Sequence, residues 1–304
     1  MQRPLILGVA ATAFWASNFE ATRIALGSLP PLSVASLRFL IATIAILVLL
    51  IWREGLAMAP LRRNLLAYII LGSLGVAGFN AALCIGLQST NPQTAALIMA
   101  TTPITSAIFD AVLSRKRPSW PALSGMALSF AGVALVLAQG HIDDISRRLN
   151  SGDLVILAGS LAWAAYGVGC TRFIRGSSPL ATTSWTMVFG TLALIGTSLH
   201  EGNLVAITLA ASPPSLIASL WMGILGSMLA YIFWTAAIAA RGVAKTAILF
   251  NLVPLFAVLI GWALGQTPAL LQIIGTALTL LGVSLSQITS PRLTLRRQPT
   301  LNAP

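Results

Sequence analysis

The chain alternates between long apolar runs and short polar connections. Ten runs have the length, about 20 residues, that an α-helix needs to cross a bilayer. They cover residues 4–26, 32–52, 66–88, 92–114, 119–139, 153–174, 180–199, 215–240, 244–264 and 268–288. The runs are continuous rather than alternating, which excludes a transmembrane β-barrel. The sequence therefore predicts an all-α membrane protein with ten transmembrane helices.

The composition agrees with a chain surrounded by lipid. Of the 304 residues, 57% are hydrophobic and 8% are charged, whereas soluble domains carry about 25% charged residues. The net charge is +11, but the basic residues lie in small clusters between apolar runs, which argues against a nucleic-acid partner. Cys84 and Cys170 lie within apolar runs and predict neither a disulfide framework nor a metal site.

Lys and Arg lie mainly on one side of the predicted membrane. With the N-terminus inside, only four of the 18 basic residues fall elsewhere: Arg147 and Arg148 in an outer loop, and Arg23 and Arg38 within spans. This positive-inside pattern predicts a bacterial-type inner (plasma) membrane protein with both termini cytoplasmic. Ala11-Thr12-Ala13 resembles a signal-peptide cleavage site, but the repeat described next requires that the first span is retained.

The two halves of the chain repeat the same order of Trp, Pro and Gly. Trp15 pairs with Trp163 at an offset of 148 residues, and Pro103 pairs with Pro254 at an offset of 151. Similar offsets relate Pro31 to Pro179, Gly72 to Gly223, Gly75 to Gly226, Pro118 to Pro268, Gly125 to Gly275 and Gly132 to Gly282. Each half holds five spans. Because five is odd, the second half enters the membrane from the opposite side.

An inverted repeat is typical of secondary transporters, whose substrate site lies near the midplane between the halves. We expect a first repeat over residues 1–139, an outer linker over 140–152, a second repeat over 153–288 and a disordered cytoplasmic tail over 289–304. A duplicated membrane scaffold with no transport role is the alternative interpretation.

Several short motifs recur in order and in duplicate. Phe14-Trp15-Ala16-Ser17-Asn18-Phe19, then Pro30-Pro31 and Arg38-Phe39, resemble the first signature of the drug/metabolite transporter superfamily, EamA type. Ala95-Ala96-Leu97, Pro103 and Arg117-Pro118 resemble its second signature. The pattern returns in Gly152-Asp153-Leu154, Ala162-Trp163-Ala164, Pro254 and Gly275.

The resemblance covers residues 4–288 and implies a ten-helix exporter of small metabolites, with helices 1, 3, 4, 6, 8 and 9 lining a central cavity. The short loops and tryptophan-rich helices are most similar to the branch that exports amino acids, including aromatic ones. Two features depart from the family pattern. The turns that commonly carry Glu read Arg115-Lys116-Arg117 and Gly265-Gln266-Thr267, and Glu20 occupies a usually apolar position.

Four charged residues fall inside the predicted spans, where a central charge costs about 2.5–3.5 kcal/mol. Glu20 and Arg23 are three residues apart, so they either pair with each other or act in gating and coupling. Asp110 lies close to the basic turn 115–117, which predicts an inner-surface salt bridge. Arg38 either ties helix 2 to a neighbour or takes part in gating or in contact with a carboxylate.

Uncharged polar residues nearer mid-span are candidates for a substrate site, with helix–helix hydrogen bonding as the alternative. They are Ser17, Asn18, Asn80, Thr101, Thr102, Tyr231 and Asn251. We expect Trp163 and Tyr166 to form the wall for an apolar or aromatic side chain, with Trp15 and Trp234 beside them. Pro103 and Pro254 are expected to kink or break helices 4 and 9, which suits gating.

Nothing in the sequence predicts an enzyme or a cofactor. His141 and His200 lie in outer loops, and there is no paired-carboxylate spacing, activated nucleophile, phosphate loop or metal cluster. A membrane enzyme acting on lipid-linked substrates would need clustered polar residues at one face, and a channel would lack saturable transport.

Few fixed charges line the expected cavity, which favours a small neutral substrate, most of all an amino acid, exported by alternating access. A sugar-phosphate or nucleotide-sugar carrier of the same superfamily is the alternative, and it would need more buried Lys or Arg. Uncoupled export and proton antiport both stay open, with Glu20 as the in-span carboxylate suited to proton exchange. We expect a monomer or a homodimer, with helices 5 and 10 as scaffold or dimer contact.

Overall fold

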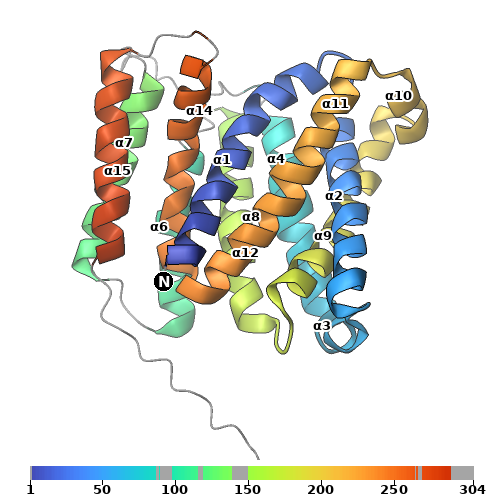
Figure 1. Ribbon diagram of the computed structural model, residues 1–304, viewed down its shortest axis with the longest axis horizontal. Coiled ribbons are helices and arrows are strands. Elements are labelled where there is room, and N and C mark those ends of the chain that lie inside the picture. Colours follow the sequence, from blue (N-terminus) through green and yellow to red (C-terminus); the bar gives the residue numbers. More distant parts are fainter. Residues whose placement is uncertain are drawn as a thin grey trace, which may run out of the picture.

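The computed structural model describes residues 2–86, 89, 98–115, 119–138, 150–263, 265 and 269–288. Within these residues the chain is helical without β-strands, and ten helical rods run along the body of the molecule (Figure 1). Six helices of the described part are long and apolar enough to cross a membrane, and shorter apolar helices accompany them. The predicted all-α membrane fold is confirmed.

The N-terminal half supplies the first five rods. The third rod is continuous through a π-helical segment, η1. In order, the elements are α1 (Gln2–Ala25), α2 (Pro31–Glu54), α3 (Met58–Leu71), η1 (Gly72–Gly78), α4 (Phe79–Gly86), α6 (Thr102–Ser114) and α7 (Trp120–Ala138).

The C-terminal half repeats this arrangement, with a second π-helical segment, η4, inside the eighth rod. Its rods are α8 (Ser151–Phe173), α9 (Pro179–Ser198), α11–η4–α12 (Pro213–Trp221, Met222–Leu229, Ala230–Arg241), α13–η5–α14 (Val243–Ala247, Ile248–Asn251, Leu252–Ala263) and α15 (Leu270–Ile288).

The helix ends follow from local chemistry. The helices α2, α9 and α11 begin at Pro31, Pro179 and Pro213, because proline has a fixed φ and no N–H to leave unpaired at the first helical position. α8 begins with a capping box: Asn150 accepts from the Asp153 backbone N–H at 2.9 Å, and the Asp153 carboxylate accepts from the Asn150 N–H at 2.8 Å.

Four rods are interrupted at equivalent places in the two halves. The π-helical segments η1 and η4 lie inside the third and eighth rods, and such segments frequently occur at functional sites. In the fourth rod α6 starts at Thr102, directly before Pro103. In the ninth rod the 3-10 turn η5 ends three residues before Pro254. The interruptions predicted beside these two prolines are therefore present.

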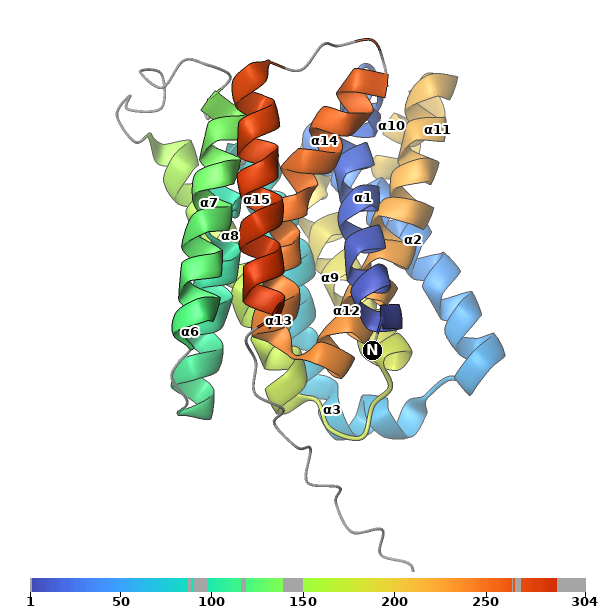
Figure 2. The same ribbon diagram turned by 60° about the vertical axis from the view of Figure 1, so that its left-hand side comes forward.

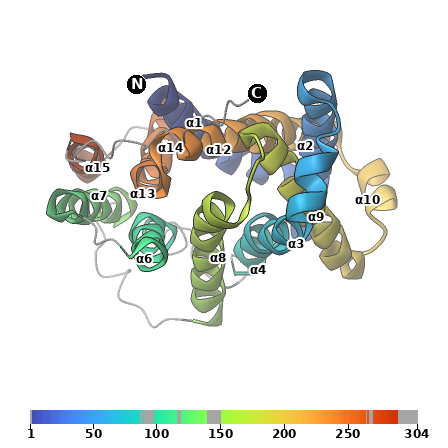
Figure 3. The same cartoon turned by 90° about the horizontal axis from the view of Figure 1, so that it is seen from below.

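Two helix pairs frame the bundle. α2 packs against α9, and α7 packs against α15 at one edge of the molecule (Figures 2 and 3). Glycines allow the second pair to approach closely: a Cβ on Gly125 would lie 2.7 Å from the Gly282 carbonyl oxygen, and a Cβ on Gly132 would lie 2.6 Å from that of Gly275. These glycines thus allow close contact between helices 5 and 10.

The third rod begins earlier than predicted, at Met58 rather than at residue 66. The basic segment with Arg62 and Arg63 continues the helix up to a kink at Asn64, whose φ is −120° and ψ is 19°. The Asn64 amide exchanges two hydrogen bonds of 2.9 Å with the backbone of Arg175. A residue far along the chain therefore holds this kink in place.

The connection after α9 also differs from the simple loop expected there. It contains a 3-10 turn, η3 (Leu199–Glu201), and a short helix, α10 (Leu204–Ala210), which is capped by the Asn203 side chain. Some predicted features fall outside the described residues: most of the linker, the tail, Ala95-Ala96-Leu97, Pro118 and Pro268.

Candidate functional site

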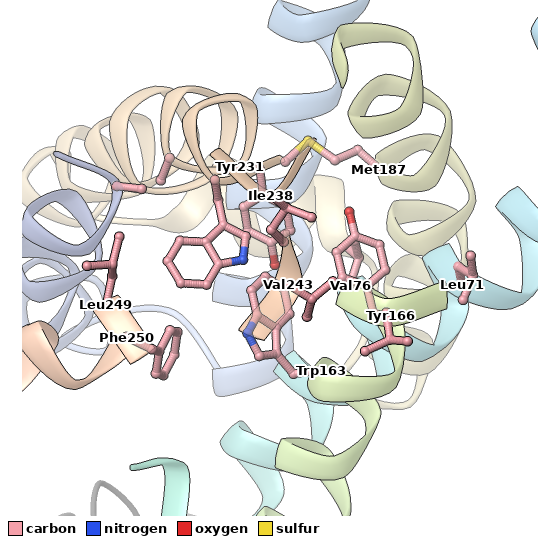
Figure 4. Close-up of a cluster of buried hydrophobic side chains, with 14 of the residues drawn as sticks. Leu71, Val76, Trp163, Tyr166, Met187, Tyr231, Ile238, Val243, Leu249 and Phe250 are labelled. Atoms are coloured by element: carbon pink, nitrogen blue, oxygen red, sulfur yellow. The ribbon is translucent and has the colours of Figure 1, made fainter. Parts of the chain in front are cut away.

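A cluster of aromatic rings occupies the centre of the bundle. The Trp15 ring on α1 lies 4.9 Å from Trp234, 5.4 Å from Phe250, 5.7 Å from Trp163 and 6.1 Å from Tyr231, measured between ring centroids. These partners come from α12, η5 and α8, so the cluster joins both repeats. Figure 4 shows Trp163, Tyr166 and Phe250 among the surrounding buried side chains.

Trp163 connects this cluster to further rings. It stacks on Tyr166 at 5.4 Å, with 27° between the ring planes, and lies 5.4 Å from Tyr231 and 5.2 Å from Phe79. Tyr231 in turn meets the edge of Phe39 at 5.7 Å. Edge-on and offset contacts of this kind are the preferred geometries of aromatic pairs. A continuous row of rings therefore runs from Tyr166 to Phe39.

Two cavities lie on either side of this row. The larger, about 470 Å³, opens toward the end of the bundle where α1 begins, and we call it the N-face cavity. Tyr166 contributes to its lining, together with Asp110 and Arg172, which form an ion pair at 3.3 Å. Asp110 therefore forms a salt bridge, but with Arg172 of α8, whereas the expectation rested on the basic turn 115–117, of which the structure describes Arg115 alone.

The smaller cavity, about 180 Å³, lies toward the opposite end of the bundle, and we call it the far-face cavity. Its polar lining includes Arg38 of α2 and Asn80 of α4; the remaining members are mainly apolar, apart from Thr22 and Cys84. Phe39, which ends the aromatic row, is the neighbour of Arg38. The row of rings therefore runs from Tyr166, which lines the N-face cavity, to the neighbour of Arg38, which lines the far-face cavity.

The two repeats meet at this site through equivalent residues. Asn18 and Tyr166 are 148 residues apart, and each packs against a glycine in the π-helical segment of the other repeat. A Cβ on Gly75 in η1 would collide with the Tyr166 ring, and a Cβ on Gly226 in η4 would collide with the Asn18 amide. The glycines are thus required where a site residue crosses the third or eighth rod.

Two buried acceptors near the aromatic cluster have no hydrogen-bond partner in the part of the chain that the structure describes. They are the Oδ1 atoms of Asn18 and Asn251. Asn251 donates its Nδ2 hydrogen to Ser129 at 2.9 Å, but its oxygen is unmatched. An unpaired buried carbonyl oxygen is unfavourable without a donor, so both oxygens are suited to a donor supplied by a ligand.

Other predicted site residues have structural contacts. Ser17 accepts from the indole N–H of Trp221 at 3.0 Å, and Thr102 bonds to Ser160 at 2.8 Å. Thr101 donates to the carbonyl of Ile98 at 2.6 Å within its own chain segment. Asn80 lines the far-face cavity but donates to the Val76 carbonyl at 2.7 Å, within η1. Unlike Asn80, Thr101 and Thr102 are not in the described lining of either cavity.

Glu20 and Arg23 form a mutual ion pair on α1, and both are solvent- or lipid-facing, with side chains 41% and 74% exposed. Neither residue lines the N-face or far-face cavity. The three phenylalanines Phe39, Phe79 and Phe250 are site members that sequence reasoning did not select. Phenylalanine is common in any membrane helix, so the residue type alone does not mark a site. The one indication in the sequence is that these residues adjoin Arg38, Asn80 and Asn251.

Each half of the chain resembles known proteins separately. The model of the EamA-like transporter family matches this chain twice, over residues 2–138 and over residues 150–287. The chain belongs to the EamA-like transporter family. It is accordingly a multi-pass membrane transporter, and the family and its named relatives are transporters rather than enzymes.

Curated relatives cover most of the chain. It is 36% identical to the "Uncharacterized transporter YyaM" of Bacillus subtilis over 272 residues, which is 89% of this chain and 88% of that protein. It is 28% identical to the "Probable terminal-alkyne amino-acid exporter" of Streptantibioticus cattleyicolor over 89% of each chain. A solved crystal structure has the same fold, with a TM-score of 0.78 at 19% identity, and covers 94% of this chain and 96% of its own.

Proposed function

We propose that this transporter exports small neutral metabolites, most of all amino acids including aromatic ones, across a bacterial inner membrane by alternating access. The N-face, where the clustered Lys and Arg lie, is then the cytoplasmic face. Both termini are cytoplasmic in this proposal, and the far-face cavity opens to the outside.

The observation that carries the proposal is the row of rings between the two cavities. A transporter that alternates needs a central site that is separated from one side while the other is open. The 470 Å³ N-face cavity ends at Tyr166, and the 180 Å³ far-face cavity lies beyond Tyr231 and Phe39. The side chains of Tyr166, Tyr231 and Phe39 come from both repeats. Rotation of one or another of them would connect the N-face cavity or the far-face cavity to a site at Trp163.

The chemistry of the site suits an amino acid. An aromatic side chain stacked on Trp163 or Tyr231 gains about 0.5–1.5 kcal/mol beyond the burial of its area. The unmatched oxygens of Asn18 and Asn251 are acceptors for an ammonium group. The relative from Streptantibioticus cattleyicolor, whose name describes an amino-acid exporter, supports the same substrate class.

The charges of the cavities argue against a phosphorylated substrate. In the N-face cavity Arg172 is already paired with Asp110, and in the described lining of the far-face cavity Arg38 is the single cationic side chain. A sugar phosphate or nucleotide sugar carries two or more negative charges in the bilayer interior, where unpaired charge is costly.

Counterflow of radiolabelled phenylalanine and threonine in proteoliposomes tests this function. We expect saturable flux, and we expect Trp163→Ala to raise the KM for phenylalanine roughly 2- to 10-fold, which corresponds to one lost ring contact. Trp120→Ala is the matched control, because that indole is 83% exposed at the start of α7. An absence of flux for every amino acid would reject the substrate class, and sugar phosphates and nucleotide sugars would then be tested.

A further inference from the structure

Arg38 occupies an unusual position for a cation. It is the eighth residue of α2 and lies away from both ends of that helix; it lines the far-face cavity and is partly buried. Its Nε donates to Ser227 Oγ of η4 at 3.2 Å, and its guanidinium carbon lies 4.6 Å from the centre of the Phe39 ring. Among the described residues it forms no ion pair. Its terminal guanidinium nitrogens are therefore available on the cavity side.

Within the described ranges, the acidic residues at this end of the bundle have partners other than Arg38; Asp153, for example, accepts from the Asn150 backbone N–H at 2.8 Å. Glu20 pairs with Arg23. Glu201 accepts from the backbone N–H groups of Leu32 and Ser33 at 3.0 and 2.7 Å, and from the Ser33 hydroxyl at 2.8 Å. A cation held in a bilayer without an acidic partner is expensive. An anion in the far-face cavity would pair with Arg38 and lower this free-energy cost.

The repeat symmetry indicates that the fold itself does not require this charge. At the offset of 148 residues that relates Trp15 to Trp163, the counterpart of Arg38 is Thr186. Thr186 lies in α9, is buried, and bonds to the Tyr166 hydroxyl at 3.2 Å. A neutral hydroxyl therefore fills the equivalent packing position in the second repeat, and the guanidinium of the N-face cavity, that of Arg172, is paired with Asp110.

We propose that Arg38 is the anchor for the carboxylate of the substrate, held in the far-face cavity. This inference rests on the proposed function and specifies its recognition step. The two terminal nitrogens of the guanidinium match the two oxygens of a carboxylate. The Phe39 ring, whose centre lies 4.6 Å from the guanidinium carbon, and the Tyr231 ring, 5.7 Å from Phe39, lie beside Arg38 and accept the apolar part of the substrate.

This geometry predicts discrimination between an amino acid and its neutral carboxyl derivative. At mildly acidic pH, where both α-amino groups are protonated, phenylalanine and phenylalaninamide share the ring and the ammonium group and differ only in the carboxylate. A charge-assisted hydrogen bond to a buried guanidinium accounts for about tenfold or more in affinity. In the wild-type protein we expect phenylalaninamide to inhibit phenylalanine counterflow at concentrations at least about tenfold above those of phenylalanine itself.

Arg38→Gln should abolish this preference, and Arg38→Lys should keep part of it, because an ammonium group retains the charge but loses the paired geometry. Arg53→Gln is the matched control, since Arg53 lies at the other end of α2, over the exposed Trp52 ring. An Arg38→Gln protein that still prefers phenylalanine to its amide as the wild type does would overturn the anchor while leaving amino-acid transport intact.

Binding measured by thermal unfolding tests the anchor even where Arg38→Gln abolishes transport. Phenylacetate, which has a ring and a carboxylate but no ammonium group, should raise the thermal unfolding midpoint of purified wild-type and Arg53→Gln protein and leave Arg38→Gln unchanged. This result without any amino-acid flux would support the anchor and reject the proposed substrate. Equal stabilisation of wild type and Arg38→Gln, or no stabilisation of either, would reject the anchor.

Discussion

Thr43 Oγ1 of α2 lies 2.7 Å from Thr191 Oγ1 of α9, and the two residues are 148 positions apart in the sequence. The same offset relates Trp15 to Trp163. Equivalent residues of two inverted repeats can touch only where the pseudo-two-fold axis passes between them. The buried hydroxyl pair therefore marks that axis, and α2 and α9 are the helices that cross on it.

The hydroxyl pair should contribute measurably to stability. We expect Thr43→Val and Thr191→Val each to lower the free energy of unfolding by about 0.6 kcal/mol, and by no more than about 1.7 kcal/mol, as for other hydrogen bonds between membrane helices. The double variant should lose less than the sum, because the partners share one bond. Reversible unfolding in mixed micelles measures the coupling, and strictly additive losses would contradict it.

The ends of the same two helices are held reciprocally. Glu201, just after α9, binds the first turn of α2 through three hydrogen bonds, while Glu54, at the end of α2, accepts one bond of 2.6 Å from Ser178 at the start of α9. Loss of a helix N-cap costs about 0.5–2 kcal/mol. We expect Glu201→Ala to lower the thermal unfolding midpoint more than Glu54→Ala. The opposite order would show that the number of bonds does not determine the effect.

Each cavity holds one native cysteine that reports on its accessibility. Cys84 lines the far-face cavity and Cys170 the N-face cavity. With the other cysteine replaced by serine, we expect Glu201→Ala to speed maleimide labelling of Cys84 and slow that of Cys170, because Pro31 and the start of α2 border the far-face cavity. Glu54→Ala should do the reverse. Faster labelling of both cysteines would indicate simple loosening instead of alternation.

Glu20 should not couple transport to protons. Its carboxylate is paired with Arg23 and lies outside both cavities. We expect Glu20→Gln to leave unchanged the ratio of phenylalanine flux measured with and without a pH gradient. Asp110→Asn is the comparison, since that carboxylate lines the N-face cavity. A ratio altered by Glu20→Gln alone would make Glu20 the coupling group.

The contact between α7 and α15 depends on small residues. In Gly125→Leu the new Cβ would lie 2.7 Å from the Gly282 carbonyl oxygen and 2.8 Å from the Ser286 nitrogen. Overpacking of this kind typically costs about 1–3 kcal/mol. Gly196→Leu is the matched control, because a Cβ there meets nothing within 4 Å. Thermal unfolding in detergent should show a lowered midpoint for Gly125→Leu and a near wild-type value for the control.

Local sequence determined much of this architecture. The starts of α2, α9 and α11 were predictable because Pro31, Pro179 and Pro213 favour a first helical position. The association of Trp15 with Trp163 was predictable because the repeat relates them, and the structure brings their rings together at 5.7 Å. The start of the third rod was not predictable, because the kink at Asn64 depends on Arg175, over a hundred residues away.

The site was only partly predictable for a similar reason. Phe39, Phe79 and Phe250 resemble any lipid-facing phenylalanine in sequence, and their role follows only from the tertiary contacts of Trp163 and Tyr231. That Arg38 has no acidic partner in the described part of the chain likewise depends on where Glu20 and Glu201 find their partners. The π-helical form of η1 and η4 has no local signal beyond glycine content.

The π-helical segments η1 and η4 allow the winding of one helix in each repeat to change. Each holds one surplus residue per turn relative to an α-helix, beside the glycine that Tyr166 or Asn18 crosses. If the π-helical segment became a regular α-helix, the helix that follows it would rotate by about 100° about its axis. Asn80 or Tyr231 would then leave its present neighbours. Each of the two oppositely oriented repeats thus contains one segment whose change of winding would rotate a helix beside the central site.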